Sequence, residues 1–327
     1  AQGLCTYSEG RPPAIPSLMA DDVAGTAAPP DEPGAEATAA DEAPPVDAAA
    51  EPADSAAGAP TPKSGPKRVL ALHGNGANSN IMRWQTDMLR SLGGDHFSWE
   101  FMDGDEEWTW ENGGNSYTDP ASEPDGRHVP QPIFMIGVSQ GMPFRGWHQV
   151  KCDDHSADRH AMQKLFDPSV PFTSNAQLDD SVERVMDHMK KHGPYDIVLA
   201  FSSGTVVVNI IAGLLRERGE ELPWGLTVFF SSVRPRDEKY QRLFKEPFTQ
   251  QAVLVWGRKG KLGDFKAQME ADWANQYSKK TVEKMYKNAV VMEHSGGHEL
   301  PRSGNVEKNV CKKVVKEMMK YCGISDK

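Results

Sequence analysis

Short apolar runs alternate with longer amphipathic runs from residue 67 to the C-terminus, after an opening stretch that has no such periodicity. The apolar runs that we expect to form strands are residues 68–72, 99–102, 197–201, 226–231, 252–256 and 289–293. The runs with helical spacing are residues 81–92, 178–192, 205–218, 265–275 and 306–321. Strands and helices in alternation predict a mostly parallel central sheet flanked by helices on both faces.

The last helix has the clearest pattern. Apolar residues recur every four positions at Val306, Val310, Val314 and Met318, and lysines occupy positions between them. That spacing gives the helix one apolar and one charged face. We expect it to cover one flank of the sheet.

A long irregular segment, residues 103–175, interrupts the alternation with Gly, Pro, Asp and Trp. Connections of this length are usually lids or binding loops, so we predict a lid-like insertion. Trp108, Trp110 and Trp147 are candidates for the wall of a substrate pocket. The alternative for each is a plain role in covering the edge of the core.

Residues 1–65 differ in composition from the rest of the chain. They hold 11 of the 24 prolines, and their 11 acidic against 2 basic residues account for −9 of the formal net charge of −10. Their low apolar content cannot offset the entropy lost on folding. We predict a disordered tail at 1–65 and an α/β domain at 66–327. A docking segment for a basic partner is the alternative interpretation of the tail.

The sequence carries no sign of a membrane span or a metal site. No run of about 18 apolar residues is present, so no membrane-spanning helix is expected. The cysteines are Cys5, Cys152, Cys311 and Cys322, and none has the CxxC spacing of metal and redox sites. We expect a cytoplasmic protein with reduced cysteines and no nucleic-acid partner.

The run Ala-Phe-Ser-Ser-Gly at residues 200–204 lies between an apolar strand and an apolar helix. Hydrolases of the α/β type present a nucleophilic serine on such a tight strand-to-helix turn, which small flanking residues make possible. Ser202 is therefore the predicted nucleophile, although Ala200 stands where glycine is usual. A simple helix cap is the alternative, because serine is favoured at the start of any helix.

A rival motif lies upstream, where Gly-Val-Ser-Gln-Gly at residues 137–141 matches GxSxG letter for letter. Residues 133–138 are apolar enough for a strand, but Pro143 and Gly146 follow too closely for a helix to begin after the turn. A motif counts only in its structural setting. We therefore expect Ser139 to be a loop residue.

The loop Leu-His-Gly-Asn-Gly at residues 72–76 follows the first strand, where α/β-hydrolases place a backbone donor to the oxyanion. The glycines permit close approach, so the N–H of Asn75 is the expected donor. The N–H of Ser203, the residue after the nucleophile, is the second donor. His73 is a candidate for the substrate pocket. A dinucleotide-binding loop is a weaker alternative, because Ser79 replaces the third glycine.

The general base should follow the nucleophile in the chain and lie on a loop after a late strand. His298 satisfies both conditions, because two glycines after the strand at 289–293 let the loop fold back over the edge of the sheet. An imidazole titrates near neutrality and can accept and return the serine proton. His294 is more simply a residue at the end of the strand.

The third member of the triad, a carboxylate that orients the imidazole, is less clearly marked. It should follow the strand at 252–256, and Asp264 is the first carboxylate after that strand. Asp264 is equally suited to cap the helix predicted at 265–275. The sequence leaves both roles open.

These segments together resemble the FSH family of serine hydrolases, over residues 68–321. The resemblance rests on residues 72–74, 145–147, 193–196, 201–204 and 293–298. It implies an α/β-hydrolase fold, no cofactor, and hydrolysis of a small-molecule acyl ester, with Ser202 and His298 as nucleophile and base.

Two departures from the family pattern bear on function. Gly260 stands where relatives carry the acid, and Ser203 replaces a common glutamine. An esterase or thioesterase of type EC 3.1, with an acyl-enzyme on Ser202, is the first interpretation. The alternative is a catalytically impaired relative that binds a small molecule or a protein, because loss of the orienting carboxylate can lower turnover about 10⁴-fold. The oligomeric state is not predicted.

Overall fold

The computed structural model describes residues 65–107, 133–148, 150–152, 172–174, 177–258, 278–302 and 304–325. All of them belong to one compact unit, Pro62–Lys327. The predicted tail at 1–65 lies almost entirely outside the described residues, and its disorder stays a prediction.

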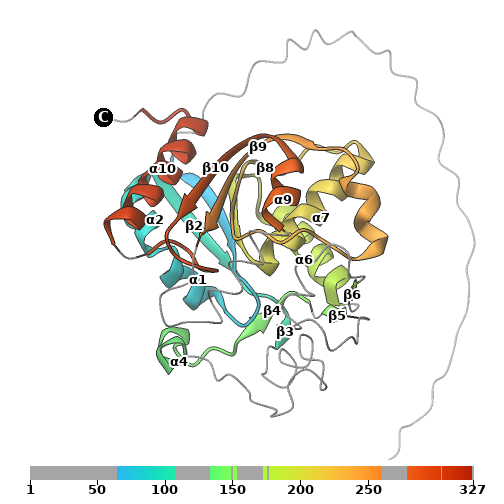
Figure 1. Ribbon diagram of the computed structural model, residues 1–327, viewed down its shortest axis with the longest axis horizontal. Coiled ribbons are helices and arrows are strands. Elements are labelled where there is room, and N and C mark those ends of the chain that lie inside the picture. The colour runs from blue at the N-terminus through green and yellow to red at the C-terminus, as the bar shows by residue number, and fades with distance from the viewer. Residues whose placement is uncertain are drawn as a thin grey trace, which may run out of the picture. The chain divides into compact units, whose positions relative to one another are not determined.

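Six strands form the central sheet, in the order β10-β9-β8-β7-β1-β2. They are β1 (Lys67–Leu72), β2 (Phe97–Met102), β7 (Tyr195–Phe201), β8 (Trp224–Phe230), β9 (Phe248–Gly257) and β10 (Tyr286–His294). Every neighbouring pair is parallel, so the carboxyl ends of all six strands meet at one edge (Figure 1). Strand β2 lies on one side of β1, and the later strands β7 to β10 follow one another on its other side. Open α/β sheets bind ligands at the point where the strand order reverses, which here is between β1 and β7.

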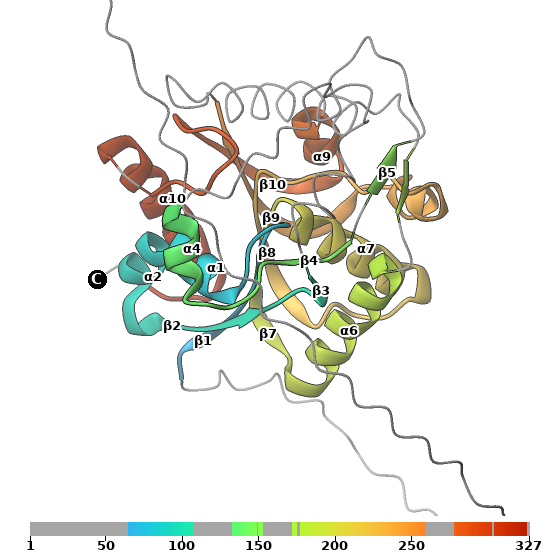
Figure 2. The ribbon, with the colours of Figure 1, turned by 90° about the horizontal axis from the view of Figure 1, so that it is seen from below.

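Helices cover both faces of the sheet, and each face has its own apolar cluster (Figure 2). The main helices are α1 (Ser79–Gln85), α2 (Asp87–Gly93), α6 (Gln177–His192), α7 (Ser203–Arg218) and α10 (Asn305–Tyr321). Val185 of α6 and Val207 of α7 are buried in one cluster. Leu89 of α2 and Val314 of α10 are buried in the other. The amphipathic pattern of the last helix therefore predicted its packing correctly.

The remaining elements are short. They are the 3-10 helices η1 (Gly94–His96) and η2 (Glu238–Phe244), the helices α4 (Ile133–Ser139) and α9 (Lys280–Lys284), and the strands β3 (Glu106–Glu107), β4 (Arg145–Gly146), β5 (Val150–Cys152) and β6 (Phe172–Ser174). Among the residues that the structure describes, no helix is long and apolar enough to cross a membrane. The helix expected at 265–275 and most of the lid predicted at 103–175 lie outside the described residues.

All six predicted strands are confirmed, as a mostly parallel sheet with flanking helices. Two details differ from the sequence prediction. The helix expected at 81–92 is divided at Thr86, whose hydroxyl donates to Met82 O at 2.8 Å and occupies a backbone acceptor of α1. Residues 133–138, which were apolar enough for a strand, belong to helix α4. A short apolar run fits a buried strand or a helix equally well, so the sequence did not distinguish the two.

Candidate active site

The turn between β7 and α7 holds Ser202 in a strained conformation. Its backbone angles are φ 50° and ψ −121°, in a region that L-residues rarely adopt. Neighbouring backbone is packed tightly against this turn, since a Cβ on Gly204 would lie 2.6 Å from His73 O. Ser202 makes no side-chain cap hydrogen bond to the helix. A simple helix cap therefore does not describe it.

Thr205, in the first turn of α7, stabilises the turn at Ser202 through two hydrogen bonds. It was not among the residues predicted from the sequence. Its buried hydroxyl donates to Ser202 O at 2.6 Å and accepts from Val233 N–H at 3.0 Å. The turn is thereby tied to the segment after β8. The sequence gives no sign of this role, because a threonine in a predicted helix fits ordinary packing equally well.

His298 lies on the loop after β10 and faces Ser202. Its Nε2 is 2.9 Å from Ser202 Oγ, and its ring lies 5.3 Å from the ring of Phe201. Burial lowers the pKa of His298 to about 4, so the imidazole is neutral at pH 7 and can accept a proton. The loop passes close to the end of β9, because a Cβ on Gly257 would collide with Gly297 O.

His294 ends β10, as the sequence suggested, and is fully buried. Its Nδ1 accepts from Gly296 N–H at 3.1 Å, which holds the turn that leads to His298. Burial lowers the pKa of His294 to about 4 as well. The second histidine of the motif therefore stabilises the loop without contacting Ser202.

The expected oxyanion donors face each other across the site. The N–H of Asn75 donates to Ser203 Oγ at 2.7 Å, and the Ser203 hydroxyl donates to Asn75 Oδ1 at 2.8 Å. Asn75 is held further by Trp147 N–H, which donates to Oδ1 at 3.1 Å, and by its own Nδ2, which donates to His148 O at 3.0 Å. The Asn75 N–H is thus near the nucleophile but engaged by a side-chain hydroxyl, which the sequence did not reveal.

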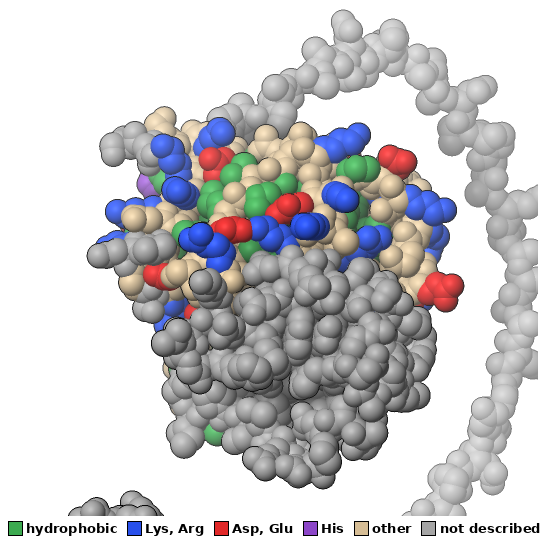
Figure 3. All heavy atoms as spheres, viewed as in Figure 1, with side chains coloured by type: hydrophobic (Ala, Val, Ile, Leu, Met, Phe, Trp, Pro, Cys, Tyr) green, Lys and Arg blue, Asp and Glu red, His purple; other side chains and the backbone are tan. Residues whose placement is uncertain are grey.

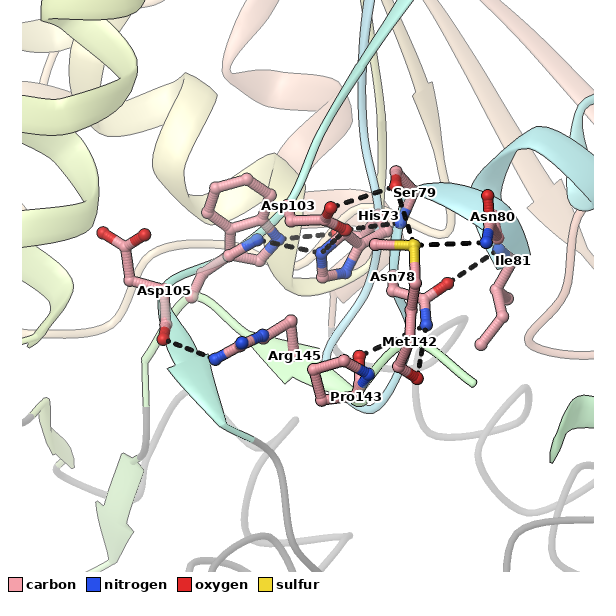
Figure 4. A network of polar contacts seen from close by, with 12 residues as sticks. His73, Asn78, Ser79, Asn80, Ile81, Asp103, Asp105, Met142, Pro143 and Arg145 are labelled. Atoms are coloured by element: carbon pink, nitrogen blue, oxygen red, sulfur yellow. Dashed lines mark hydrogen bonds and ion pairs between the residues drawn. The ribbon is translucent and has the colours of Figure 1, made fainter. Parts of the chain in front are cut away.

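The side chains of His73, in the loop at 72–76, and of Trp147 point into the protein, and both are fully buried. His73 Nδ1 lies 2.6 Å from Gly74 O, and Nε2 accepts from Gly104 N–H at 3.0 Å, so the ring proton is on Nδ1 (Figure 4). Trp147 Nε1 donates to His73 O at 2.7 Å. Burial lowers the pKa of His73 to about 4. Both residues were candidates for the pocket wall, and in the structure their buried side chains support the loop at 72–76.

The surroundings of His73 extend into a polar network on α1 and the nearby loops. Asp103 accepts hydrogen bonds from the backbone N–H and the hydroxyl of Ser79, and its carboxylate lies 3.8 Å from His73 Nε2 (Figure 4). Asn78 Nδ2 donates to Met142 O and Pro143 O. These contacts hold the loop after β1 in a fixed position beside the nucleophile.

Ser139, the rival serine, is the last residue of α4 and not a loop residue. It is buried, and its hydroxyl donates to Ile136 O at 2.7 Å. Its GxSxG motif therefore overlaps the end of a helix, where the strand that presents a nucleophile should be.

Three candidate residues lie outside the described residues: Asp264, Trp108 and Trp110. Their roles stay predictions. Within the described ranges, no group of three or more His, Cys, Asp or Glu side chains is arranged to hold a metal ion.

Comparisons of sequence and structure identify relatives of this chain. A sequence model described as "Serine hydrolase (FSH1)" matches residues 63–310. A Danio rerio protein named Esterase OVCA2 is 22% identical over 242 residues, which cover 73% of this chain and 92% of that protein. The Xenopus tropicalis protein of the same name is 23% identical over 139 residues, covering 42% of this chain and only 56% of its relative. The crystal structure of Arabidopsis thaliana SOBER1 aligns with a TM-score of 0.42 and 13% identity, over 78% of this chain and 99% of that one.

Proposed function

Because the chain belongs to the serine hydrolase (FSH1) family, we propose that it cleaves carboxylic esters or thioesters through an acyl-enzyme on Ser202. The observation that carries this proposal is the 2.9 Å contact between Ser202 Oγ and His298 Nε2, made by a serine on a strained strand-to-helix turn. A nucleophile within hydrogen-bond reach of its base is the arrangement that activates a hydroxyl.

In the first half of the reaction, Ser202 Oγ attacks the acyl carbon and its proton passes to His298 Nε2. The neutral state of His298 favours this step, since a protonated ring has no lone pair to accept the proton. The tetrahedral intermediate collapses when the imidazolium returns the proton to the departing alcohol or thiol. The acyl group is then esterified to Ser202.

In the second half, His298 takes a proton from water, and the hydroxide equivalent attacks the same acyl carbon. Collapse of the second intermediate releases the carboxylic acid and restores the Ser202 hydroxyl. The backbone N–H groups of Asn75 and Ser203 are the proposed donors to the negative oxygen of both intermediates. For Asn75 this requires the N–H to exchange Ser203 Oγ for the substrate oxygen.

Asp264 is the proposed third member, and its role would be to hold the other ring nitrogen of His298. The proposed substrate is a small-molecule acyl ester or thioester, and the mechanism uses only side chains, backbone donors and water. A cytoplasmic location is part of the proposal, on the basis of the cysteine spacing.

The direct test is turnover of a short-chain aryl ester and its thioester analogue by the wild type and by Ser202→Ala, His298→Gln and Ser139→Ala. Ser202→Ala and His298→Gln should lose at least about 10³-fold in kcat, because each removes an essential member of the pair. Ser139→Ala is the matched control and should stay active. Wild-type protein that binds the ester but does not turn it over would instead support the impaired relative.

A further inference from the structure

Strand β10 forms one edge of the central sheet. Among the described strands it pairs with β9 alone, in parallel, so its outer side offers unpaired backbone groups. An extended edge of this kind is a template for a further strand. The strand is nine residues long, which corresponds to about 30 Å of edge at about 3.4 Å per residue.

The middle of β10 is apolar and exposed on both faces. Val290 is 39% exposed and Val291 is 42% exposed, and successive residues of a strand point to opposite faces. Figure 3 shows hydrophobic side chains gathered in the region of β10, with basic and acidic side chains around them. An apolar centre with a charged rim is the pattern of a protein interface.

Features that normally block an exposed edge are absent from the middle of β10. Residues 288–292 contain no proline and no charge, and the one irregularity in pairing lies at the start of the strand, between Tyr286 and Asn288. Natural sheets protect their edges with prolines, bulges and inward-pointing charges. The central part of this strand has none of them, so it remains able to pair.

The charges at the two ends of β10 suit a second copy of the same strand. If two copies pair antiparallel about a two-fold axis through Val290, Lys287 of each lies opposite Glu293 of the other, because the two positions are equidistant from the axis. Glu293 already forms an ion pair with Lys279 and lies 3.6 Å from Arg258. The pairing would extend this group of charges across the interface.

We propose that two copies of this chain associate through β10, in antiparallel register centred on Val290, and join their two sheets into one continuous sheet. The backbone groups of the edge then pair with their counterparts, and Val290 and Val291 are buried against the partner. A heterologous protein strand is the competing occupant. The self-complementary charge order favours a second copy over it.

The first test measures mass by sedimentation equilibrium for the full chain, the wild type beside Val290→Lys and Val290→Thr. The wild type should be dimeric in the micromolar range. Val290→Lys places two like charges together at the axis and should raise the dimer dissociation constant at least about tenfold. Val290→Thr keeps a branched side chain and should remain dimeric.

Cysteine cross-linking supplies a second readout that does not depend on disrupting the strand. Directly opposed residues in an antiparallel pair have Cα atoms about 4.5 to 5.5 Å apart, which a disulfide can bridge. Val290→Cys should therefore form a covalent dimer on mild oxidation, beyond the background from the four native cysteines. Asn288→Cys would lie opposite Met292 and should not. A monomeric wild type, or a dimer that Val290→Lys leaves intact and Val290→Cys does not cross-link, would overturn the proposal.

Discussion

The dependence of activity on pH should reveal the environment of His298. Only the neutral imidazole can take the proton of Ser202, so kcat/KM should rise as pH rises through the pKa of this residue. Burial lowers that pKa from 6.5 to about 4. The enzyme should therefore keep its activity in mildly acidic solution, where an ordinary histidine would be protonated.

The size of the effect follows from the two pKa values. At pH 5 a histidine with a pKa of about 4 is roughly 90% neutral, whereas one with a pKa of about 6.5 is roughly 3% neutral. The two cases differ about 30-fold in the active form of the free enzyme. A difference of this size is well outside the error of steady-state kinetics.

The assay is kcat/KM between about pH 4 and 8 on an ester whose alcohol does not ionise in that range, with the product separated by chromatography. The rate of labelling by a fluorophosphonate should show the same acid limb, because it needs the same neutral base. Folding must be followed by circular dichroism at each pH. His73, His294 and His298 all have lowered pKa values, so the free energy of unfolding should fall as pH falls from about 6.5 toward 4.

An acid limb near pH 6.5, in protein that is still folded, would refute the reasoning. It would mean that burial does not control the ionisation of His298. The carboxylate proposed at the other ring nitrogen, that of Asp264, would then be the cause that offsets burial, because a nearby negative charge raises the pKa of an imidazole.

Three further predictions concern residues around the site and the tail. Ser203→Ala removes the hydroxyl that engages Asn75 N–H, so kcat/KM should rise about fivefold, corresponding to about 1 kcal/mol; a fall would show that the hydroxyl positions the loop instead. Asp264→Asn should lower kcat about 10² to 10⁴-fold with little change in the melting temperature, whereas unchanged kinetics would assign Asp264 to the helix cap. Deletion of residues 1–65 should leave melting temperature and turnover nearly unchanged, and a large loss of either would show that the tail contacts the domain.

The sequence predicted the centre of the sheet because strands β1, β7, β8 and β9 are largely buried and read as continuous apolar runs. The same reasoning failed at residues 133–138, since a six-residue apolar run does not distinguish a strand from helix α4. The choice of Ser202 over Ser139 rested on structural context. In the structure Ser202 follows strand β7, whereas Ser139 ends helix α4.

The contacts that hold the site could not be derived from the sequence. His73 and Trp147 were candidates for the substrate pocket, with a role in covering the core as the alternative for Trp147, and both side chains are buried. Their polar atoms bond to backbone far along the chain. The pairing of Asn75 with Ser203 also joins residues 128 positions apart. Local patterns identify which residues carry chemistry, whereas long-range hydrogen bonds decide which of them stay accessible.

The central claim is that Ser202 is the nucleophile, and the most direct test is to map the serine that a fluorophosphonate modifies. We predict one modified residue per chain, on the peptide that contains Ser202, and no labelling of Ser202→Ala. The Ser139→Ala variant should label at the wild-type rate. Modification on the peptide that contains Ser139 would contradict the account.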